Sequence, residues 1–124
     1  MPNTATEGQS QLRRRPNPGT RAYTIYVIRL KSTVLKDRRF RQKNPDYVDK
    51  KPCVYVGMTY LTCEERLAQH QSGIHSARIV RNFGKHCVSG LCRRTKAITR
   101  SRALKREAKL AATLREKGWG VWSN

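Results

Sequence analysis

The chain has 124 residues, enough for one domain with a modest hydrophobic core and too few for two. It carries 27 Lys and Arg residues against 8 Asp and Glu residues, a formal net charge of +19. This excess favours a polyanionic partner, with nucleic acid as the first candidate and an anionic membrane surface as the second. No apolar run could span a bilayer and no hydrophobic signal segment opens the chain, so we expect a cytoplasmic or nucleoid-associated protein.

Residues 1–20 are polar, are dotted with Gly and Pro, and contain three consecutive arginines at positions 13–15. They hold too few apolar side chains to bury a core, so we expect a disordered basic arm. This arm either grips phosphate groups or is a solvated tail. The predicted folded domain then comprises residues 21–124.

Residues 23–30 are rich in β-branched and aromatic side chains, which predicts a first strand. Both of its faces are largely apolar, so this strand is expected to be central and covered on both sides. Residues 31–52 are mostly charged and contain an Asn-Pro-Asp turn signal, which predicts an exposed loop insertion between two antiparallel strands. Three residues could anchor this insertion on the body of the domain: Phe40, Tyr47 and Val48.

Residues 53–56 predict a short buried strand, which a glycine ends. Thr62 and Glu65 then have the Thr-x-x-Glu spacing of a capping box, which predicts the start of a helix. Arg66 and His70 lie four residues apart and therefore share one face of this helix. A strand carrying a tyrosine, a glycine turn and a helix with a guanidinium and an imidazole together predict a functional site.

The second half of the chain continues with alternating elements. We expect a short helix over residues 76–83 and a third strand over residues 86–91. A long helix is predicted over residues 95–117, ended by a glycine. Residues 119–122 are expected to form a short extended segment that covers the core.

The four cysteines, at positions 53, 63, 87 and 92, form no Cys-x-x-Cys pair. Cys53 and Cys87 lie in apolar runs, where a thiol packs as a small hydrophobic group. We therefore expect reduced, structural thiols. A zinc site that adds His70 or His86 is the alternative, although the spacing matches no standard ligand pattern.

The last predicted helix carries an acid on its apolar side. Leu104, Ala111 and Leu114 form an apolar stripe at helical spacing, and Glu107 lies on the same side. A buried carboxylate costs free energy unless a cation or hydrogen bonds compensate it. Glu107 either pairs with a neighbouring Lys or Arg at the edge of the stripe, which the helix pattern alone favours, or faces a cleft as a metal ligand.

Four motifs, in this order, resemble those of the GIY-YIG nuclease family. Residues 24–28 (Thr-Ile-Tyr-Val-Ile) and 55–59 (Tyr-Val-Gly-Met-Thr) resemble the two strands that name the family. Arg66 with His70 resembles its arginine helix, and Glu107 resembles the metal-binding glutamate of its later helix. The likeness covers about a hundred residues, and the segment 76–84 is similar to small stand-alone bacterial and phage members. It implies an α/β (α+β) fold in which helices flank a small central antiparallel sheet of about three strands.

The resemblance also implies a function, a divalent-metal-dependent endonuclease that hydrolyses phosphodiester bonds in DNA, or alternatively in RNA. Glu107 would be the protein ligand of Mg²⁺ or Mn²⁺, and Arg66 would hold the phosphate. Tyr26 or Tyr55 would orient or deprotonate the attacking water. A free phenol has a pKa near ~10, so a cation or base must assist it, and His70 could do this or bind the phosphate itself.

Departures from the family pattern favour a second hypothesis. Thr24 replaces the first glycine, Met58 stands where many members have a lysine, and Asn124 is the sole counterpart of a later asparagine. They motivate a catalytically inactive nucleic-acid-binding module of the same fold, while a basic ribosome-associated or structural protein is a third hypothesis. Seven residues are expected to face DNA without selecting sequence, or else to be plain solvated charge. They are Arg93, Arg94, Lys96, Arg100, Arg102, Lys105 and Arg106.

Overall fold

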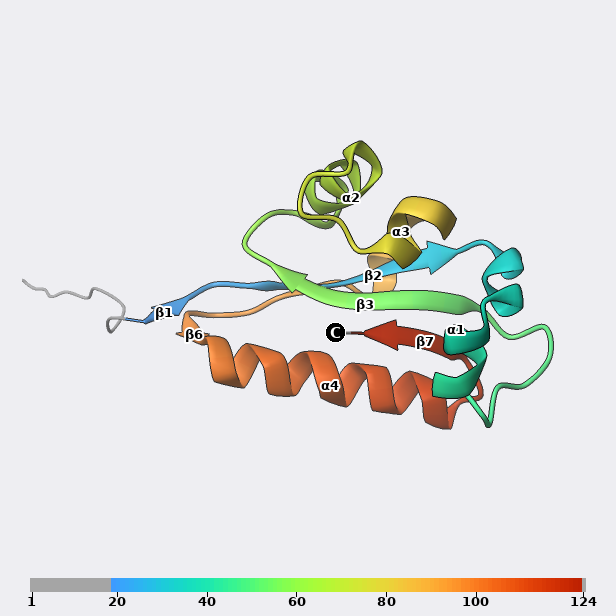
Figure 1. Ribbon diagram of the computed structural model, residues 1–124. Coiled ribbons are helices and arrows are strands. Elements are labelled where there is room, and N and C mark those ends of the chain that lie inside the picture. Colours follow the sequence, from blue (N-terminus) through green and yellow to red (C-terminus); the bar gives the residue numbers. More distant parts are fainter. Residues whose placement is uncertain (1–18, 124) are drawn as a thin grey trace, which may run out of the picture.

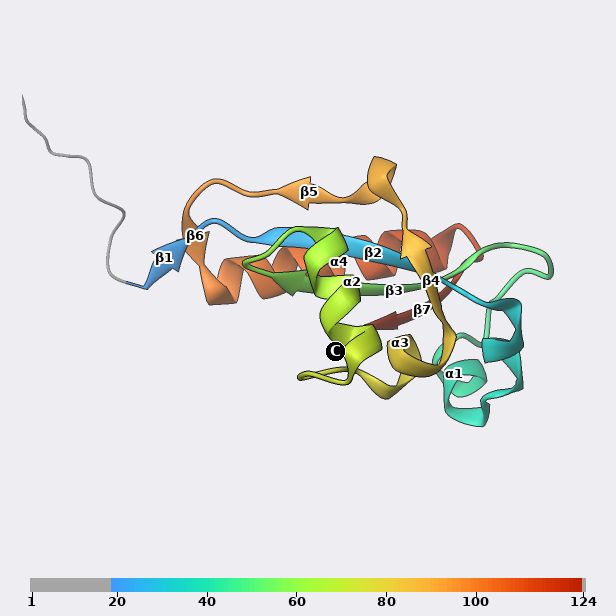
Figure 2. The same ribbon diagram turned by 90° about the horizontal axis from the view of Figure 1, so that it is seen from above.

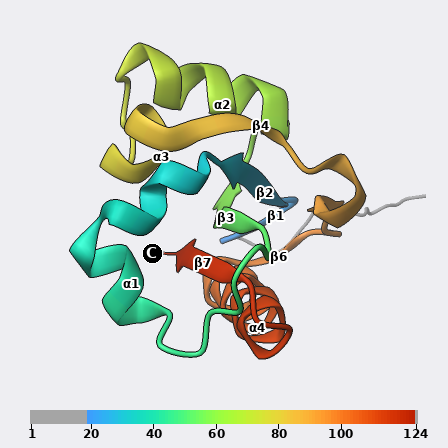
Figure 3. The same ribbon diagram turned by 90° about the vertical axis from the view of Figure 1, so that its right-hand side faces the viewer.

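The computed structural model describes residues 19–123, so residues 1–18 of the predicted basic arm lie outside the described part. A sheet forms the middle layer of an α/β fold, with helices α2 and α3 on one face and helix α4 on the other (Figures 1 and 3). The fold class expected from the sequence is thus confirmed. Thr20, the last residue of the predicted arm, belongs to the first strand.

The elements alternate along the chain. The strands are β1 (Thr20–Arg21), β2 (Thr24–Leu30), β3 (Cys53–Thr59), β4 (Gly84–Cys87), β5 (Arg93–Arg94), β6 (Ile98–Thr99) and β7 (Gly120–Ser123). The helices are α1 (Arg38–Lys43), α2 (Cys63–Ser72), α3 (Arg78–Phe83) and α4 (Arg100–Glu116), with short 3-10 helices η2 (Ser32–Lys36) and η3 (Ser89–Leu91).

The main sheet has the strand order β4-β2-β3-β7, and β5 also pairs with β2. Strands β2 and β3 are antiparallel, as predicted, and their register sets Tyr26 opposite Gly57. The sheet differs from the three antiparallel strands expected, because it has five strands and β7 runs parallel to β3. Helix α4 makes this parallel pairing feasible, since it returns the chain along the sheet before β7 begins.

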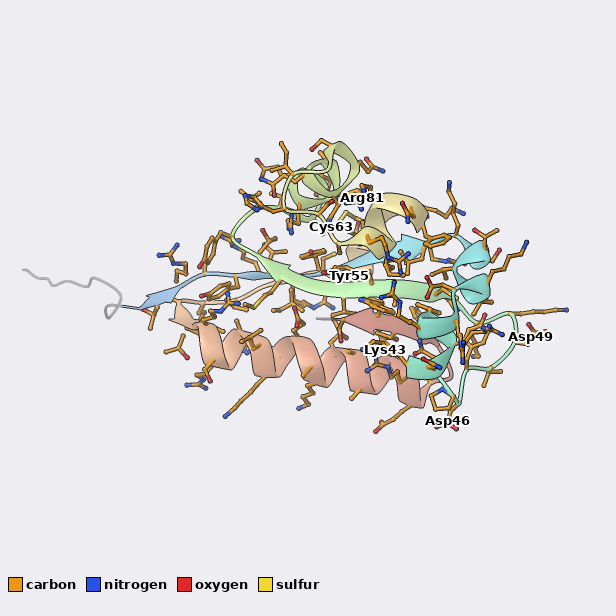
Figure 4. The ribbon with its side chains drawn as sticks, in the orientation of Figure 1. Lys43, Asp46, Asp49, Tyr55, Cys63 and Arg81 are labelled. Atoms are coloured by element: carbon orange, nitrogen blue, oxygen red, sulfur yellow. A yellow bond between two sulfur atoms is a disulfide. The ribbon has the colours of Figure 1, made fainter. Side chains whose placement is uncertain are left out.

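Strand β2 is buried on both sides, as its composition predicts. Ile25 and Val27 pack in the core beneath α4, while Tyr26 and Ile28 pack in the core beneath α2 and α3. On β3 the same alternation turns Tyr55 toward α2 and α3 (Figure 4). The two tyrosines of the predicted site therefore share one face of the sheet.

The insertion between β2 and β3 differs from the exposed loop expected. It contains η2 and α1, and the side chain of Asp37 caps α1 by accepting a hydrogen bond from the Phe40 amide. Asp37 also forms an ion pair with Arg78 of α3, and Phe40 is buried and stacks on Trp122. Local capping and one aromatic anchor thus fold a segment whose overall composition is charged.

Two cysteines are paired, contrary to the reduced thiols expected. Cys63 at the start of α2 and Cys87 at the end of β4 form a disulfide, whereas Cys53 and Cys92 are free. The pairing was invisible in the sequence because 24 residues separate the two cysteines and only the packing of α2 against β4 brings them together. Within residues 19–123 no three His, Cys, Asp or Glu side chains form a metal-binding group, so nothing supports the zinc alternative.

Among the described residues, no helix has the length and apolar character needed to cross a membrane.

Candidate active site

A buried hydrogen bond joins the first motif strand to the arginine helix. The hydroxyl of Tyr26 on β2 lies 2.9 Å from Nε2 of His70 on α2. The Tyr26 ring can reach His70 because it crosses β3 at Gly57, where a Cβ atom would lie only 2.6 Å from the Tyr26 hydroxyl. A glycine at this position is therefore a steric requirement of the site.

The hydrogen bonds of His70 assign its tautomer. The backbone N–H of Ala77, just before α3, donates to Nδ1 at 3.0 Å, so this nitrogen carries no proton. The proton of the neutral ring then sits on Nε2 and is donated to the Tyr26 oxygen. His70 is thus a hydrogen-bond donor to the phenol, and this arrangement leaves it no means of accepting the phenol's proton.

Burial and charge shift both groups. Burial, followed by the positive charge of Arg66, lowers the pKa of His70 to about 4. Burial and the neighbouring Tyr55 raise the pKa of the Tyr26 hydroxyl above its ordinary value, while the guanidinium of Arg66 opposes the shift. At neutral pH the site therefore holds a neutral imidazole beside a neutral phenol.

Four of the five predicted catalytic residues come together. The Tyr55 ring lies 6.0 Å from the Tyr26 ring and 5.5 Å, edge-on, from the His70 ring, measured between centroids. Arg66 lies one turn before His70 on α2, donates to Gln69 Oε1 and to the His75 carbonyl oxygen, and is half-buried.

The three rings are closed off from solvent, with 1% of Tyr26, 1% of Tyr55 and 0% of His70 exposed. Arg66 is thus the most exposed of the four clustered residues.

The fifth residue, Glu107, is buried in α4 with 3% of its surface exposed. Burial raises the pKa of Glu107 to about 7, against the opposing charge of Arg100. The ion pair that the helix pattern favours is not found, since the salt bridge seen in the described part of the chain joins Arg78 and Asp37. No hydrogen bond to Glu107 is observed from residues 19–123 either. The structure thus has a buried carboxylate that no described hydrogen bond or ion pair compensates.

Glu107 approaches from the other side of the sheet. Helix α4 packs on the face opposite the two tyrosines. The strands thus lie between α4, which carries Glu107, and α2, which carries His70 (Figure 1). The parallel pairing of β7 stops at Val56, and within the described region no strand pairs with Gly57 on that edge of β3. The shared pocket expected from the sequence stays a prediction.

All seven predicted DNA-facing residues are exposed. They lie on β5, on the segment that follows it and on the first half of α4 (Figure 2). Arg93 and Arg106 line a hollow of about 250 Å³ whose apolar lining includes Ile25 and Leu110. Two of these cations, Arg93 on β5 and Arg106 on α4, thus meet at one hollow beside β2.

Two features of the site escaped the sequence analysis. The Ala77 amide that sets the His70 tautomer is a backbone group, and side-chain patterns do not report backbone donors. Tyr60, an exposed aromatic beside the site, could have been found from its position directly after the second motif.

Compared with protein-family models, with curated proteins and with solved structures, the chain has no match.

Proposed function

We propose that the protein is a divalent-metal-dependent endonuclease that hydrolyses phosphodiester bonds in DNA through a GIY-YIG-type site. The observation that carries the proposal is the buried hydrogen bond between Tyr26 and His70, beside Tyr55 and Arg66. These residues come from the first three of the four motifs that resemble the family. The net charge of +19 adds sequence-independent attraction to a polyanion.

The proposed roles follow from the protonation states. Because His70 donates to the Tyr26 oxygen, Tyr26 keeps its own hydroxyl proton, and we assign Tyr26 to orienting the attacking water. His70 stabilises negative charge that develops on the phenol oxygen. Arg66 binds the phosphate and offsets the charge that grows on its oxygens in the transition state.

Glu107 fits the carboxylate ligand of a hard cation. Its burial without a described hydrogen bond leaves two oxygens available. Mg²⁺ takes one or two protein carboxylates and completes its shell with water and phosphate oxygens. Mg²⁺ or Mn²⁺ bound there would supply charge stabilisation to a phosphate group that reaches the α4 side of the sheet.

Nicking of supercoiled plasmid and cleavage of a labelled oligonucleotide, with Mg²⁺ or Mn²⁺ and then with chelator, test the proposal. We expect Arg66→Ala and Glu107→Gln each to lower the rate by roughly 10²- to 10³-fold, the range for loss of one transition-state contact. Glu116→Gln is the matched control, because Glu116 is exposed near the end of the same helix. Cleavage by the wild type no faster than by Glu107→Gln would refute the catalytic assignment.

A second candidate is a nucleic-acid-binding module without hydrolytic activity. The near-complete burial of Tyr26, Tyr55 and His70 favours it, because water and phosphate must enter a closed cluster before reacting. This candidate predicts strongly salt-dependent DNA binding and no metal-dependent cleavage. Cleavage that Arg66→Ala abolishes while DNA binding persists would rule it out.

We further propose a cytoplasmic location, beside the nucleic acid. The cytoplasm keeps most thiols reduced, so the Cys63–Cys87 disulfide would there be subject to reduction.

A further inference from the structure

An exposed aromatic side chain follows the strand that carries the second motif. Tyr60 comes directly after β3, and 48% of its surface is exposed. Thr59, its neighbour, pairs with Thr24, while Gly57 pairs with Tyr26. These two pairs are separated by two residues, or about 7 Å along the strands. Tyr60 is therefore one or two nucleotide lengths from the candidate active site.

The Tyr60 ring is held in place by its neighbours. The guanidinium of Arg21 lies over the ring, 4.4 Å from its centroid, and the Tyr23 ring lies 5.1 Å away at a tilt of 39°. Arg94 fixes the backbone, since its Nη1 donates to the Tyr60 carbonyl oxygen at 2.9 Å and to Thr24 Oγ1 at 2.8 Å. A ring ordered in this way loses little conformational freedom when a ligand stacks on it.

The surroundings of the ring are positively charged. Arg21 and Arg94 flank Tyr60. Arg100, at the start of α4, lies close enough to act electrostatically on the neighbouring Tyr23. No carboxylate among residues 19–123 forms an ion pair with any of these three arginines. A half-exposed aromatic ring beside uncompensated guanidinium groups has the chemistry of a site for a base and its phosphate.

We infer that Tyr60, together with Arg21 and Arg94, stacks an unpaired base and holds its phosphate, so that the protein selects single-stranded nucleic acid. The inference rests on the proposed function and specifies its substrate class. Bases within a duplex are stacked on one another and leave no face for Tyr60, whereas every unpaired base offers one. Since stacking uses the π-face, the surface selects strandedness and not sequence.

Fluorescence anisotropy with the full chain tests this inference in buffer containing EDTA, where binding is measured without cleavage. The probes are a labelled 12-nucleotide single strand, as DNA and as RNA, and the blunt DNA duplex of the same sequence. Tyr60→Ala should weaken single-strand binding by about 5- to 150-fold, the range for loss of one stacked base, and leave duplex binding unchanged. Tyr60→Phe should bind as the wild type does, because it keeps the ring.

Ile74→Ala is the matched control, since Ile74 is an exposed apolar residue (55%) in the loop after α2. Its affinity for the single strand should equal that of the wild type. A selective loss in either the DNA or the RNA arm supports the inference and identifies the preferred strand. Equal losses on single strand and duplex, or no loss in Tyr60→Ala, overturn it. This binding assay does not depend on cleavage. If the wild type cleaves no DNA but Tyr60→Ala still loses single-strand affinity selectively, the nuclease proposal is refuted and this inference holds.

Discussion

At position 57 of β3 a hydrogen atom occupies the place where any other side chain would meet the Tyr26 ring. A Cβ there would lie 2.6 Å from two Tyr26 atoms, and the hydroxyl is one of them. Real Cβ atoms do not approach that closely, so the ring would have to move away from His70. The absence of a side chain at Gly57, in the second motif, thus makes room for the ring of Tyr26, in the first motif.

We therefore expect Gly57→Ala to lower the free energy of unfolding by about 1–3 kcal/mol, the usual cost of overpacking, and to slow cleavage. Urea unfolding and plasmid nicking measure the two effects. Gly90→Ala is the control, because a Cβ at Gly90 meets nothing within 4 Å and should leave both quantities unchanged. Wild-type stability in Gly57→Ala would contradict the steric argument.

The depressed pKa of His70 links this residue to the pH dependence of stability. The imidazole titrates near 6.5 in the unfolded chain and at about 4 in the folded protein. Between these values the unfolded chain binds a proton that the folded protein does not. The free energy of unfolding should therefore fall as the pH drops from about 6.5 to about 4, by up to about 3 kcal/mol from this group.

Urea unfolding between pH 4 and 7.5 measures this loss. His70→Gln should be less stable than the wild type at pH 7.5 and should lack this part of the pH dependence. His86→Gln is the control, because His86 is exposed, and should retain the full slope. Identical slopes for His70→Gln and the wild type would refute the neutral, donor form of His70.

Helix α2 positions both Arg66 and His70, so its attachment to the sheet matters for the site. A capping box of Thr62 and Glu65 starts the helix, and Gly73 ends it in the left-handed conformation, as the sequence predicts. The disulfide between Cys63 and Cys87 adds a covalent link from the first residue of α2 to β4. The helix is therefore defined locally but held in place by a distant contact.

We expect reduction of this disulfide to lower the free energy of unfolding by about 3 kcal/mol, since the bond closes a loop of 24 residues in the unfolded chain. Urea midpoints with and without dithiothreitol measure the change. The Cys63→Ser/Cys87→Ser double variant should match the reduced wild type and no longer respond to reductant. Cys92→Ser, which removes a free thiol, should respond as the wild type does. Equal midpoints for oxidised and reduced wild type would contradict the prediction.

At the scale of elements, the start of α4 shows how sheet pairing overrides a local helical pattern. The sequence predicted a helix from residue 95, but α4 begins at Arg100, capped by the side chain of Thr99. Thr95 instead exchanges hydrogen bonds with the Tyr23 backbone, and Ile98 and Thr99 pair with β1. These partners lie about 75 positions earlier in the chain, so a window of local sequence cannot anticipate them.

At the scale of the whole molecule, the exposed positive charge and the buried rings lie in different layers. The uncompensated cations lie on β5 and α4 beside the sheet, whereas the three rings lie beneath α2 and α3 (Figure 2). None of these cations forms an ion pair with a described carboxylate, so their charge remains available to a polyanion.

The sequence by itself determined the features that depend on neighbouring residues. It specified the two motif strands, their antiparallel pairing, the capped helix with Arg66 and His70 on one face, and the position of Glu107 on the inner side of its helix. Side-chain periodicity and capping are local, so these features could be predicted without knowledge of the rest of the chain.

Only the tertiary structure decided the parallel pairing of β7, the disulfide between α2 and β4, the tautomer of His70 and the face of the sheet from which Glu107 approaches. Each depends on groups that lie far apart in the chain and meet through packing of the layers. A pattern can place a residue on the inner side of a helix, but only the packed layers decide what that side faces.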